Sequence, residues 1–374
     1  MEVDATIARM PKAELHLHLE GTISAETLWA IAQRNQVALP VGTLAELKSL
    51  YGFEGFDKFL NLWLAMCRCL RADADYELMV DAFAEDCRRQ NIRYVEAHFT
   101  PYNHERFGFG ARRALSIVTR RIEAAERDGG PVIRLITDIP SESVPESGPF
   151  TVRLLEEEAH PLIVAIGLGG PEEGFPRRLV EEHFKRARDA GYPVVAHAGE
   201  TAGAAHVWEA IDHLKARRVQ HGVRAAEDPA LLARLAERDI CCDVCLTSNT
   251  FLTVYRELAA HPLPQMLAAG VPVTLSTDDP PFFGTDLNRE YQRAHSELGL
   301  SLAALWQIDL NGLRYGLAEL PLRRRLMKEF RSAGAALGLE RGGLIPTAVS
   351  AAASDPPPRP CAPAPARSRR GPRA

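Results

Sequence analysis

The chain has 374 residues, of which 46% are hydrophobic and 25% are charged, a composition typical of soluble globular proteins. Its formal net charge of −5 provides no positive field that would attract nucleic acid or an anionic membrane, so neither is an expected partner. No apolar run reaches the roughly 18 residues of a membrane span, and the first residues lack the pattern of a secretion signal. We therefore expect a cytoplasmic protein.

Eight short apolar runs are the predicted strands, and helical patterns separate most of them. The strands are expected at residues 14–19, 94–99, 132–139, 163–168, 194–197, 218–221, 240–246 and 271–276. The clearest helical patterns cover residues 25–35, 111–127, 175–190, 205–216 and 229–237. Strands that alternate with helices pair in parallel, and eight such strands close a barrel. The predicted fold class is therefore α/β, a (β/α)₈ TIM barrel.

Two segments are longer than the connections that a minimal eight-stranded barrel needs. Residues 38–92 are rich in Phe, Leu, Trp and Met, and predict extra helices after the first strand. That position is where barrels carry active-site loops, so the segment could form an apolar wall or lid that includes Trp63, although plain helix packing gives the same pattern. Residues 286–340 have a helical pattern throughout.

The C-terminal residues differ in composition from the rest of the chain. From residue 351 onward the sequence contains seven prolines, five arginines and no aromatic residue. Such a stretch buries too little apolar surface to offset the entropy of ordering it. We therefore predict one barrel domain over residues 1–345 and a disordered Pro/Arg-rich tail over residues 346–374.

Histidine and acidic residues stand at the carboxyl ends of four predicted strands, where barrel enzymes place their catalytic groups. His16 and His18 share one face of the first strand because side chains alternate along an extended chain. His197, His221 and Asp278 end three other strands. Three histidines and one carboxylate from such strand ends could meet at a single ion, and these donors suit Zn²⁺. A zinc-activated water would then make the protein a hydrolase.

Three further side chains near these strand ends offer proton chemistry. Glu200 follows His197 closely and remains free to donate a proton. His221 could accept a proton from the activated water or fix its direction. Asp279 follows Asp278 directly. Adjacent side chains have different orientations, so Asp278 could bind the metal while Asp279 points to the substrate.

Six motifs together resemble the adenosine and adenine deaminases of the amidohydrolase superfamily. They are PKAELHLHLEG at 11–21, YVEAHFTP at 94–101, VAHAGE at 195–200, QHGV at 220–223, CLTSN at 245–249 and STDDP at 276–280. The resemblance extends in order and spacing over nearly all of residues 8–340. It implies the barrel fold and the hydrolytic deamination of a purine at C6.

The resemblance also implies a role for each matching residue. One zinc ion per chain is held by His16, His18, His197 and Asp278. Glu200 protonates N1 of the purine while the activated water attacks C6, and His221 acts as the base or the orienting group. Asp279 contacts N7, and the backbone N–H of Gly170 meets N3.

Departures from the family pattern bear on the substrate. Glu20 stands where the nucleoside deaminases usually have Asp, and this resembles the adenine-specific branch, whereas residues 245–249 and 281–286 resemble the nucleoside branch. Gly167 stands where those enzymes usually have Asp, which would remove a charge from the pocket floor. We predict adenosine-type nucleosides as the first substrate class, with Glu20, His18, Gly170 and Asp279 in contact with the substrate. Adenine and 6-aminodeoxyfutalosine are the alternatives.

Other interpretations remain open. A binuclear hydrolase of the same superfamily would need a bridging lysine at the end of the fourth strand, where the sequence reads IGLGG at 166–170. A non-catalytic purine-binding barrel would be expected to have lost some ligands, yet all are present. Glu96 and His98 on the second strand are interpreted as a structural pair rather than as site residues. The sequence does not indicate an oligomeric state.

Overall fold

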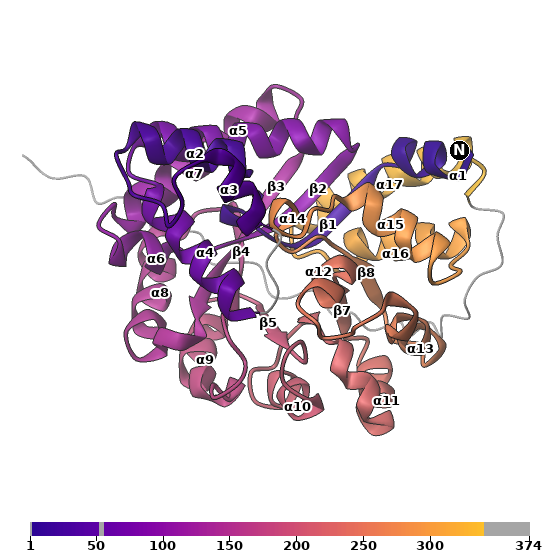
Figure 1. Cartoon of the computed structure of the whole chain (residues 1–374). Helices are drawn as coiled ribbons and strands as arrows, with labels where there is room; N and C mark the ends of the chain where they lie inside the picture. The colour runs from indigo at the N-terminus through magenta and orange to yellow at the C-terminus, as the bar shows by residue number, and fades with distance from the viewer. Residues whose placement is uncertain (1, 52–55, 340–374) are drawn as a thin grey trace, which may run out of the picture.

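The protein is an eight-stranded parallel barrel surrounded by helices (Figure 1). The computed structural model describes residues 2–51 and 56–339, so the predicted domain boundary at 345 and the predicted tail lie outside the described residues. The strands are β1 (Lys12–His18), β2 (Ile92–Phe99), β3 (Val132–Pro140), β4 (Ile163–Gly169), β5 (Val194–Ala198), β6 (Arg218–His221), β7 (Cys241–Val244) and β8 (Val273–Leu275). They follow one another in chain order, and every neighbouring pair is parallel. The predicted TIM barrel is confirmed.

Helices cover the outside of the barrel. Those before β5 are α1 (Glu2–Arg9), α2 (Ala25–Arg34), α3 (Leu44–Leu50), α4 (Phe56–Cys69), α5 (Asp73–Arg89), α6 (Pro101–Arg106), α7 (Ala111–Arg127), α8 (Val144–Glu158) and α9 (Glu181–Asp189). Those after β5 are α10 (Ala204–Asp212), α11 (Pro229–Glu237), α12 (Leu246–Phe251), α13 (Leu263–Ala268), α14 (Pro280–Phe283), α15 (Leu287–Ser296), α16 (Leu302–Tyr315) and α17 (Leu320–Ala336). Short 3₁₀ helices are η1 (Glu20–Thr22), η2 (Ser141–Ser143), η3 (Arg177–Val180), η4 (Val223–Glu227) and η5 (Leu258–Ala260).

Local sequence signals explain where several of these helices begin. The side chain of Ser24 caps α2 by accepting the N–H of Thr27, and Thr43 and Glu46 form a capping box at α3. Asp228 caps α11 in the same way. The helix predicted over 175–190 is instead divided into η3 and α9. Strand β7 is shorter than predicted because α12 begins at Leu246, and β8 is also shorter than predicted.

Two strand ends close the barrel at the position of a predicted site residue. Leu17 of β1 forms a parallel bridge with Asp278, beyond β8. The backbone N–H of His18 donates to Asp278 O at 2.9 Å, and the N–H of Asp278 donates to His16 O at 3.1 Å. Closure of the barrel therefore brings two histidines and one aspartate together.

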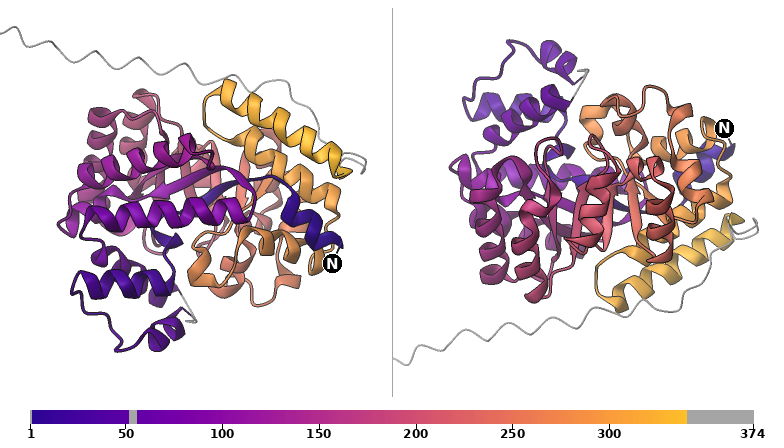
Figure 2. Two further views of the ribbon diagram at one scale, coloured as in Figure 1. Left: turned by 90° about the horizontal axis from the view of Figure 1, so that it is seen from above. Right: turned by 90° about the horizontal axis from the view of Figure 1, so that it is seen from below.

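The extra helices after β1 stand at one end of the barrel. Figure 2 shows the segment that contains α2, α3 and α4 projecting away from the strands. Helix α4 turns several apolar side chains toward the pocket described below, so it forms the predicted apolar wall. Helix α16 packs against β1 and β8 on the other side of the molecule. Within the described residues, none of the helices combines the length and the apolar character that a bilayer crossing requires.

Candidate active site

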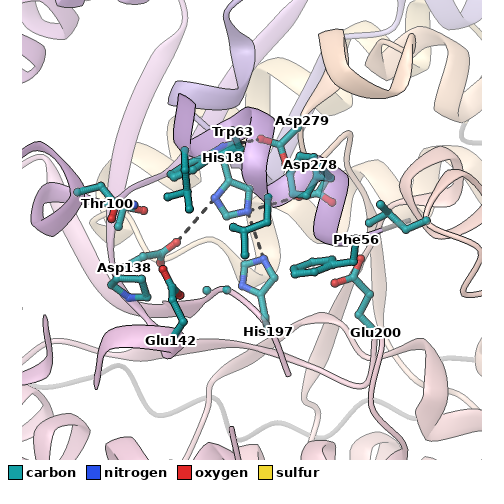
Figure 3. Close-up of a pocket in the computed structure, with 18 of the residues that line it drawn as sticks. His18, Phe56, Trp63, Thr100, Asp138, Glu142, His197, Glu200, Asp278 and Asp279 are labelled. Atoms are coloured by element: carbon teal, nitrogen blue, oxygen red, sulfur yellow. Dashed lines mark hydrogen bonds and ion pairs between the residues drawn. The ribbon is translucent and has the colours of Figure 1, made fainter. Parts of the chain in front are cut away.

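A pocket of about 610 Å³ lies among the residues at the carboxyl ends of the strands. Its polar side includes His18, His197, Glu200, His221, Asp278 and Asp279, and its apolar side includes Phe56, Phe59, Leu60, Trp63 and Leu64 of α4. A concave apolar site with a few convergent polar groups is typical of small-molecule binding. Figure 3 shows the polar groups converging around His18 and His197.

The four predicted metal ligands lie at distances that suit one ion. The Nε2 atom of His197 is 3.1 Å from Nε2 of His16 and 3.3 Å from Nε2 of His18. Oδ1 of Asp278 is 3.5 Å from Nε2 of His16 and 3.4 Å from Nε2 of His18. Ligands about 2.0–2.1 Å from a tetrahedral zinc ion are separated by about 3.3 Å. The donor set and its spacing therefore fit zinc.

Hydrogen bonds on the outer nitrogens orient two of these rings. Nδ1 of His197 lies 2.7 Å from Leu168 O, and Nδ1 of His16 lies 3.2 Å from Asp243 O. A carbonyl oxygen can only accept, so Nδ1 carries the proton in both rings. Both Nε2 lone pairs then face the shared point, as in metal sites with a second layer of hydrogen bonds.

The charges at the site also favour a cation. Burial holds the pKa values of His16 and His197 well below 6.5, so both rings are neutral at pH 7, as metal ligands must be. Burial alone would raise the pKa of Asp278, but the hydrogen bond from His18 and the neighbouring histidines hold it well below its usual range. Burial would lower the pKa of His18, yet Asp279, Asp278 and Asp138 raise it to about 10. The ionised carboxylate of Asp278 contributes a negative charge that a bound cation would balance.

His221 lies beside the four ligands. Its Nε2 atom is 3.5 Å from Oε2 of Glu200 and 4.0 Å from Oδ2 of Asp278. The ligand atoms of His16, His197, His221 and Asp278 all lie within 4.8 Å of one another, so the distances do not exclude His221 as a ligand in place of His18. Burial lowers the pKa of His221 to about 4. His221 and Asp278 have φ values of +59° and +65°. Residues other than glycine rarely adopt this left-handed conformation, so the backbone is strained at both positions and the surrounding structure must hold it there.

Two buried carboxyl groups face the pocket, and their burial favours the protonated form of both. Burial, followed by the charges of Asp278 and Glu172, raises the pKa of Glu200 well above 4.5. Burial likewise raises the pKa of Asp279 well above its usual value. Oε1 of Glu200 and Oδ2 of Asp279 have no hydrogen-bond partner among the described residues. Each group can therefore donate a proton or a hydrogen bond to a molecule in the pocket.

The position of Asp279 depends on its neighbours. Trp63 Nε1 donates to Oδ1 of Asp279 at 3.2 Å, which links the wall formed by α4 to the polar side of the pocket. A Cβ atom on Gly21 would lie 1.7 Å from the same oxygen. Residue 21 must therefore be glycine for Asp279 to occupy this place.

Three of the four predicted substrate-binding residues line the pocket, and the fourth does not. Gly170 lines it, as do Asp279 and His18. Glu20 is fully buried, accepts the N–H of Thr100 at 2.9 Å and lies 3.1 Å from Nε2 of His104, and it is not among the lining residues. The Oε1 atom of Glu20 is thus bound within the protein, and the contact between Glu20 and a substrate stays a prediction.

Asp138 is a pocket residue that the sequence analysis did not identify. A Cβ atom on Gly167 would lie 1.8 Å from Oδ1 of Asp138, so this carboxylate fills the space that a side chain at position 167 would take. Asp138 of β3 therefore places a carboxyl group beside Gly167, and burial raises the pKa of this group to about 7. The inference that Gly167 removes a charge from the pocket floor stays a prediction. Figure 3 shows Asp138 beside His18, whose Nδ1 is 3.8 Å from Oδ2 of Asp138. Its place at the end of the third predicted strand was the signal that could have found it.

His98 and Glu96 do not pair with each other as predicted. Nδ1 of His98 lies 2.9 Å from Oδ1 of Asp138, near the pocket. Glu96 instead accepts from Arg218 Nη1 at 2.6 Å in a fully buried ion pair. The two side chains thus have different partners, and Nε2 of His98 has no hydrogen-bond partner among the described residues.

A second residue absent from the sequence analysis holds the loop that carries Glu200. Oε2 of Glu172 accepts the backbone N–H groups of Glu200 at 3.1 Å and Ala202 at 2.6 Å. The fully buried Arg177 donates to Pro171 O at 2.9 Å and to His197 O at 3.2 Å. The loop after β4 is thus bound to the end of β5, and Glu172 is a positioning residue for Glu200.

We expect Glu172→Ala to lower kcat by about 10²-fold, the usual cost of displacing a reacting group by about 1 Å. Glu172→Gln should retain most of kcat, because its amide oxygen can accept the same two N–H groups. Zinc content should be unchanged in both variants. Steady-state kinetics with metal analysis would check this, and a Glu172→Ala protein with wild-type kcat would contradict the positioning role.

Comparison with known proteins agrees with this arrangement. The adenosine deaminase family profile matches residues 11–333. An aminodeoxyfutalosine deaminase from Streptomyces coelicolor is 38% identical over 330 residues, which cover 88% of this chain and 85% of the relative. An adenine deaminase from Bordetella parapertussis is 36% identical over 315 residues, which cover 83% and 97%. The crystal structure of an amidohydrolase from Burkholderia ambifaria with bound zinc has a TM-score of 0.83 and 28% identity, and covers 91% of this chain and 95% of that one.

Proposed function

Because the chain belongs to the adenosine deaminase family, we propose that it removes the 6-amino group of adenine or aminodeoxyfutalosine by hydrolysis at a single zinc ion. The observation that carries the proposal is the cluster of His16, His18, His197 and Asp278 next to the carboxyl group of Glu200. Nε2 of His197 and Oδ1 of Asp278 each lie 3.1–3.5 Å from Nε2 of both His16 and His18. Zinc in a relative of similar structure supports the choice of metal.

In the reaction a C6–O bond forms, the C6–N bond breaks and ammonia leaves. Zinc held by the four ligands would supply a Lewis acid that activates water at neutral pH. Glu200 donates its proton to N1. Protonation of N1 withdraws electron density from C6 and makes this carbon more electrophilic. Asp279 donates a hydrogen bond to N7, and the backbone N–H of Gly170 donates to N3. These contacts place C6 next to the metal ligands.

The relatives favour adenine and aminodeoxyfutalosine over adenosine, which the sequence analysis placed first. Asn103 and Glu142 line the pocket, and Oδ1 of Asn103 and Oε2 of Glu142 are buried without a partner in the described part of the chain. Two unpaired acceptors favour a ligand that offers hydrogen-bond donors, because a buried polar group left unpaired is costly. The N9–H of adenine and the hydroxyl groups of a nucleoside are both such donors.

A panel of adenine, adenosine, deoxyadenosine and 6-aminodeoxyfutalosine tests the proposal through the loss of aminopurine absorbance. We expect kcat/KM for adenine or 6-aminodeoxyfutalosine to exceed that for adenosine by roughly 10-fold or more, a discrimination within the range of a few pocket contacts. A clear preference for adenosine would contradict the substrate assignment. No turnover of any of the four would contradict the function itself.

A further inference from the structure

A chain of hydrogen bonds leads from the backbone of α13 to His221. The N–H of Leu263 donates to Nδ1 of His261 at 3.1 Å. Nε2 of His261 lies 3.2 Å from Oδ1 of Asn249, and Nδ2 of Asn249 lies 3.1 Å from Nδ1 of His221. Asn249 and His261 are both buried. We call Asn249 and His261 the relay.

The direction of every bond in the relay follows from its first member. A backbone N–H can only donate, so Nδ1 of His261 accepts and its neutral ring carries the proton on Nε2. That proton is donated to Oδ1 of Asn249, which fixes the orientation of the amide. The Nδ2 group of Asn249 then donates to Nδ1 of His221. The proton of the neutral His221 ring must therefore be on Nε2.

We infer that Asn249 and His261 are positioning residues that hold His221 as a hydrogen-bond donor toward the pocket, and neither as a metal ligand nor as a base. A protonated Nε2 has no lone pair to offer, which selects His18 rather than His221 as the fourth ligand. Nε2 of His221 has no hydrogen-bond partner within the residues described, so its N–H is available to an oxygen atom in the pocket. The role in catalysis rests on the proposed function, whereas the proton position does not.

Nuclear magnetic resonance of zinc-loaded protein with ¹⁵N-labelled histidine tests the proton position directly. Long-range ¹H–¹⁵N correlations distinguish a protonated from an unprotonated ring nitrogen, and loss of the signal in His221→Gln assigns it. We expect Nε2 of His221 to be protonated and Nδ1 to be unprotonated. In Asn249→Asp the new carboxylate can only accept, so the proton should move to Nδ1.

A matched pair of variants tests the outer member of the relay. His261→Gln and His261→Phe both lose the contact with Leu263, but only the glutamine can still donate to Oδ1 of Asn249. We expect kcat to fall by about 10²–10⁴-fold in Asn249→Asp and His261→Phe, as for other catalytic histidines held in the wrong tautomer. KM should change little, and His261→Gln should remain within about 10-fold of wild type.

Two results would overturn the inference. One is a wild-type His221 that is protonated on Nδ1 or lacks a proton on Nε2. The other is wild-type kcat in both Asn249→Asp and His261→Phe. Because the spectra do not depend on turnover, a protein that deaminates none of the purines would contradict the proposed function and still report the proton position.

Discussion

Glu200→Gln is expected to lower kcat by about 10²–10⁴-fold, the usual contribution of one positioned proton donor. Burial raises the pKa of Glu200 well above 4.5, and one of its carboxyl oxygens has no partner in the part of the chain that the structure describes. The amide of glutamine can still donate a hydrogen bond to N1 but cannot transfer a proton. KM and zinc content should therefore change little, which steady-state kinetics and metal analysis would measure.

Glu172→Gln is the matched control for this experiment. Both substitutions replace a buried carboxyl group by an amide, and the two residues are in direct contact through the N–H of Glu200. Glu200 is proposed to transfer a proton and Glu172 is not, so Glu172→Gln should retain most of the wild-type kcat. If Glu200→Gln kept kcat within a few-fold of wild type, the general-acid role would be refuted.

Removal of zinc is expected to abolish turnover, with less than about 1% of activity remaining, because the uncatalysed attack of water on C6 lacks an activated nucleophile. One equivalent of Zn²⁺ should restore activity. Mg²⁺ should not, because it prefers six oxygen ligands and the site offers three imidazole nitrogens and one carboxylate. Activity should be followed while a chelator and then each metal are added.

Asp278→Asn provides a control for the chelation experiment. It keeps the size of the side chain and the backbone bonds that close the barrel but removes the charge that a cation needs. We expect weaker zinc binding and a fold that is retained by far-ultraviolet circular dichroism. Full activity of the metal-free wild-type protein would exclude the zinc mechanism.

The sequence was sufficient to predict the barrel and the residues that converge at its end. Strand periodicity placed His16 and His18 on one face, and the parallel arrangement placed His197, His221 and Asp278 at the same edge. These inferences need only the direction of each strand. The bridge between Leu17 and Asp278 then brings the first and last strand ends together.

Contacts that depend on side-chain packing could not be predicted in the same way. The glycine at position 167 suggested that the pocket lacks a carboxylate there. The space beside Gly167 is filled by the carboxyl group of Asp138 from the neighbouring strand. Glu20 lies two residues beyond β1, at the start of η1, where its Oε1 atom contacts Thr100 and His104. Glu172 and His261 lie outside the regular elements, so neither periodicity nor strand direction indicates where their side chains point.

We expect His16 and His18 of β1, His197 of β5 and Asp278 after β8 to share one zinc ion. An anomalous difference map from crystals measured at the zinc absorption edge tests it most directly. We predict one peak per chain, about 2.0–2.2 Å from Nε2 of His16, His18 and His197 and from a carboxylate oxygen of Asp278. A second peak at His98 and Asp138, a peak bound to Nε2 of His221, or no peak in active crystals would contradict it.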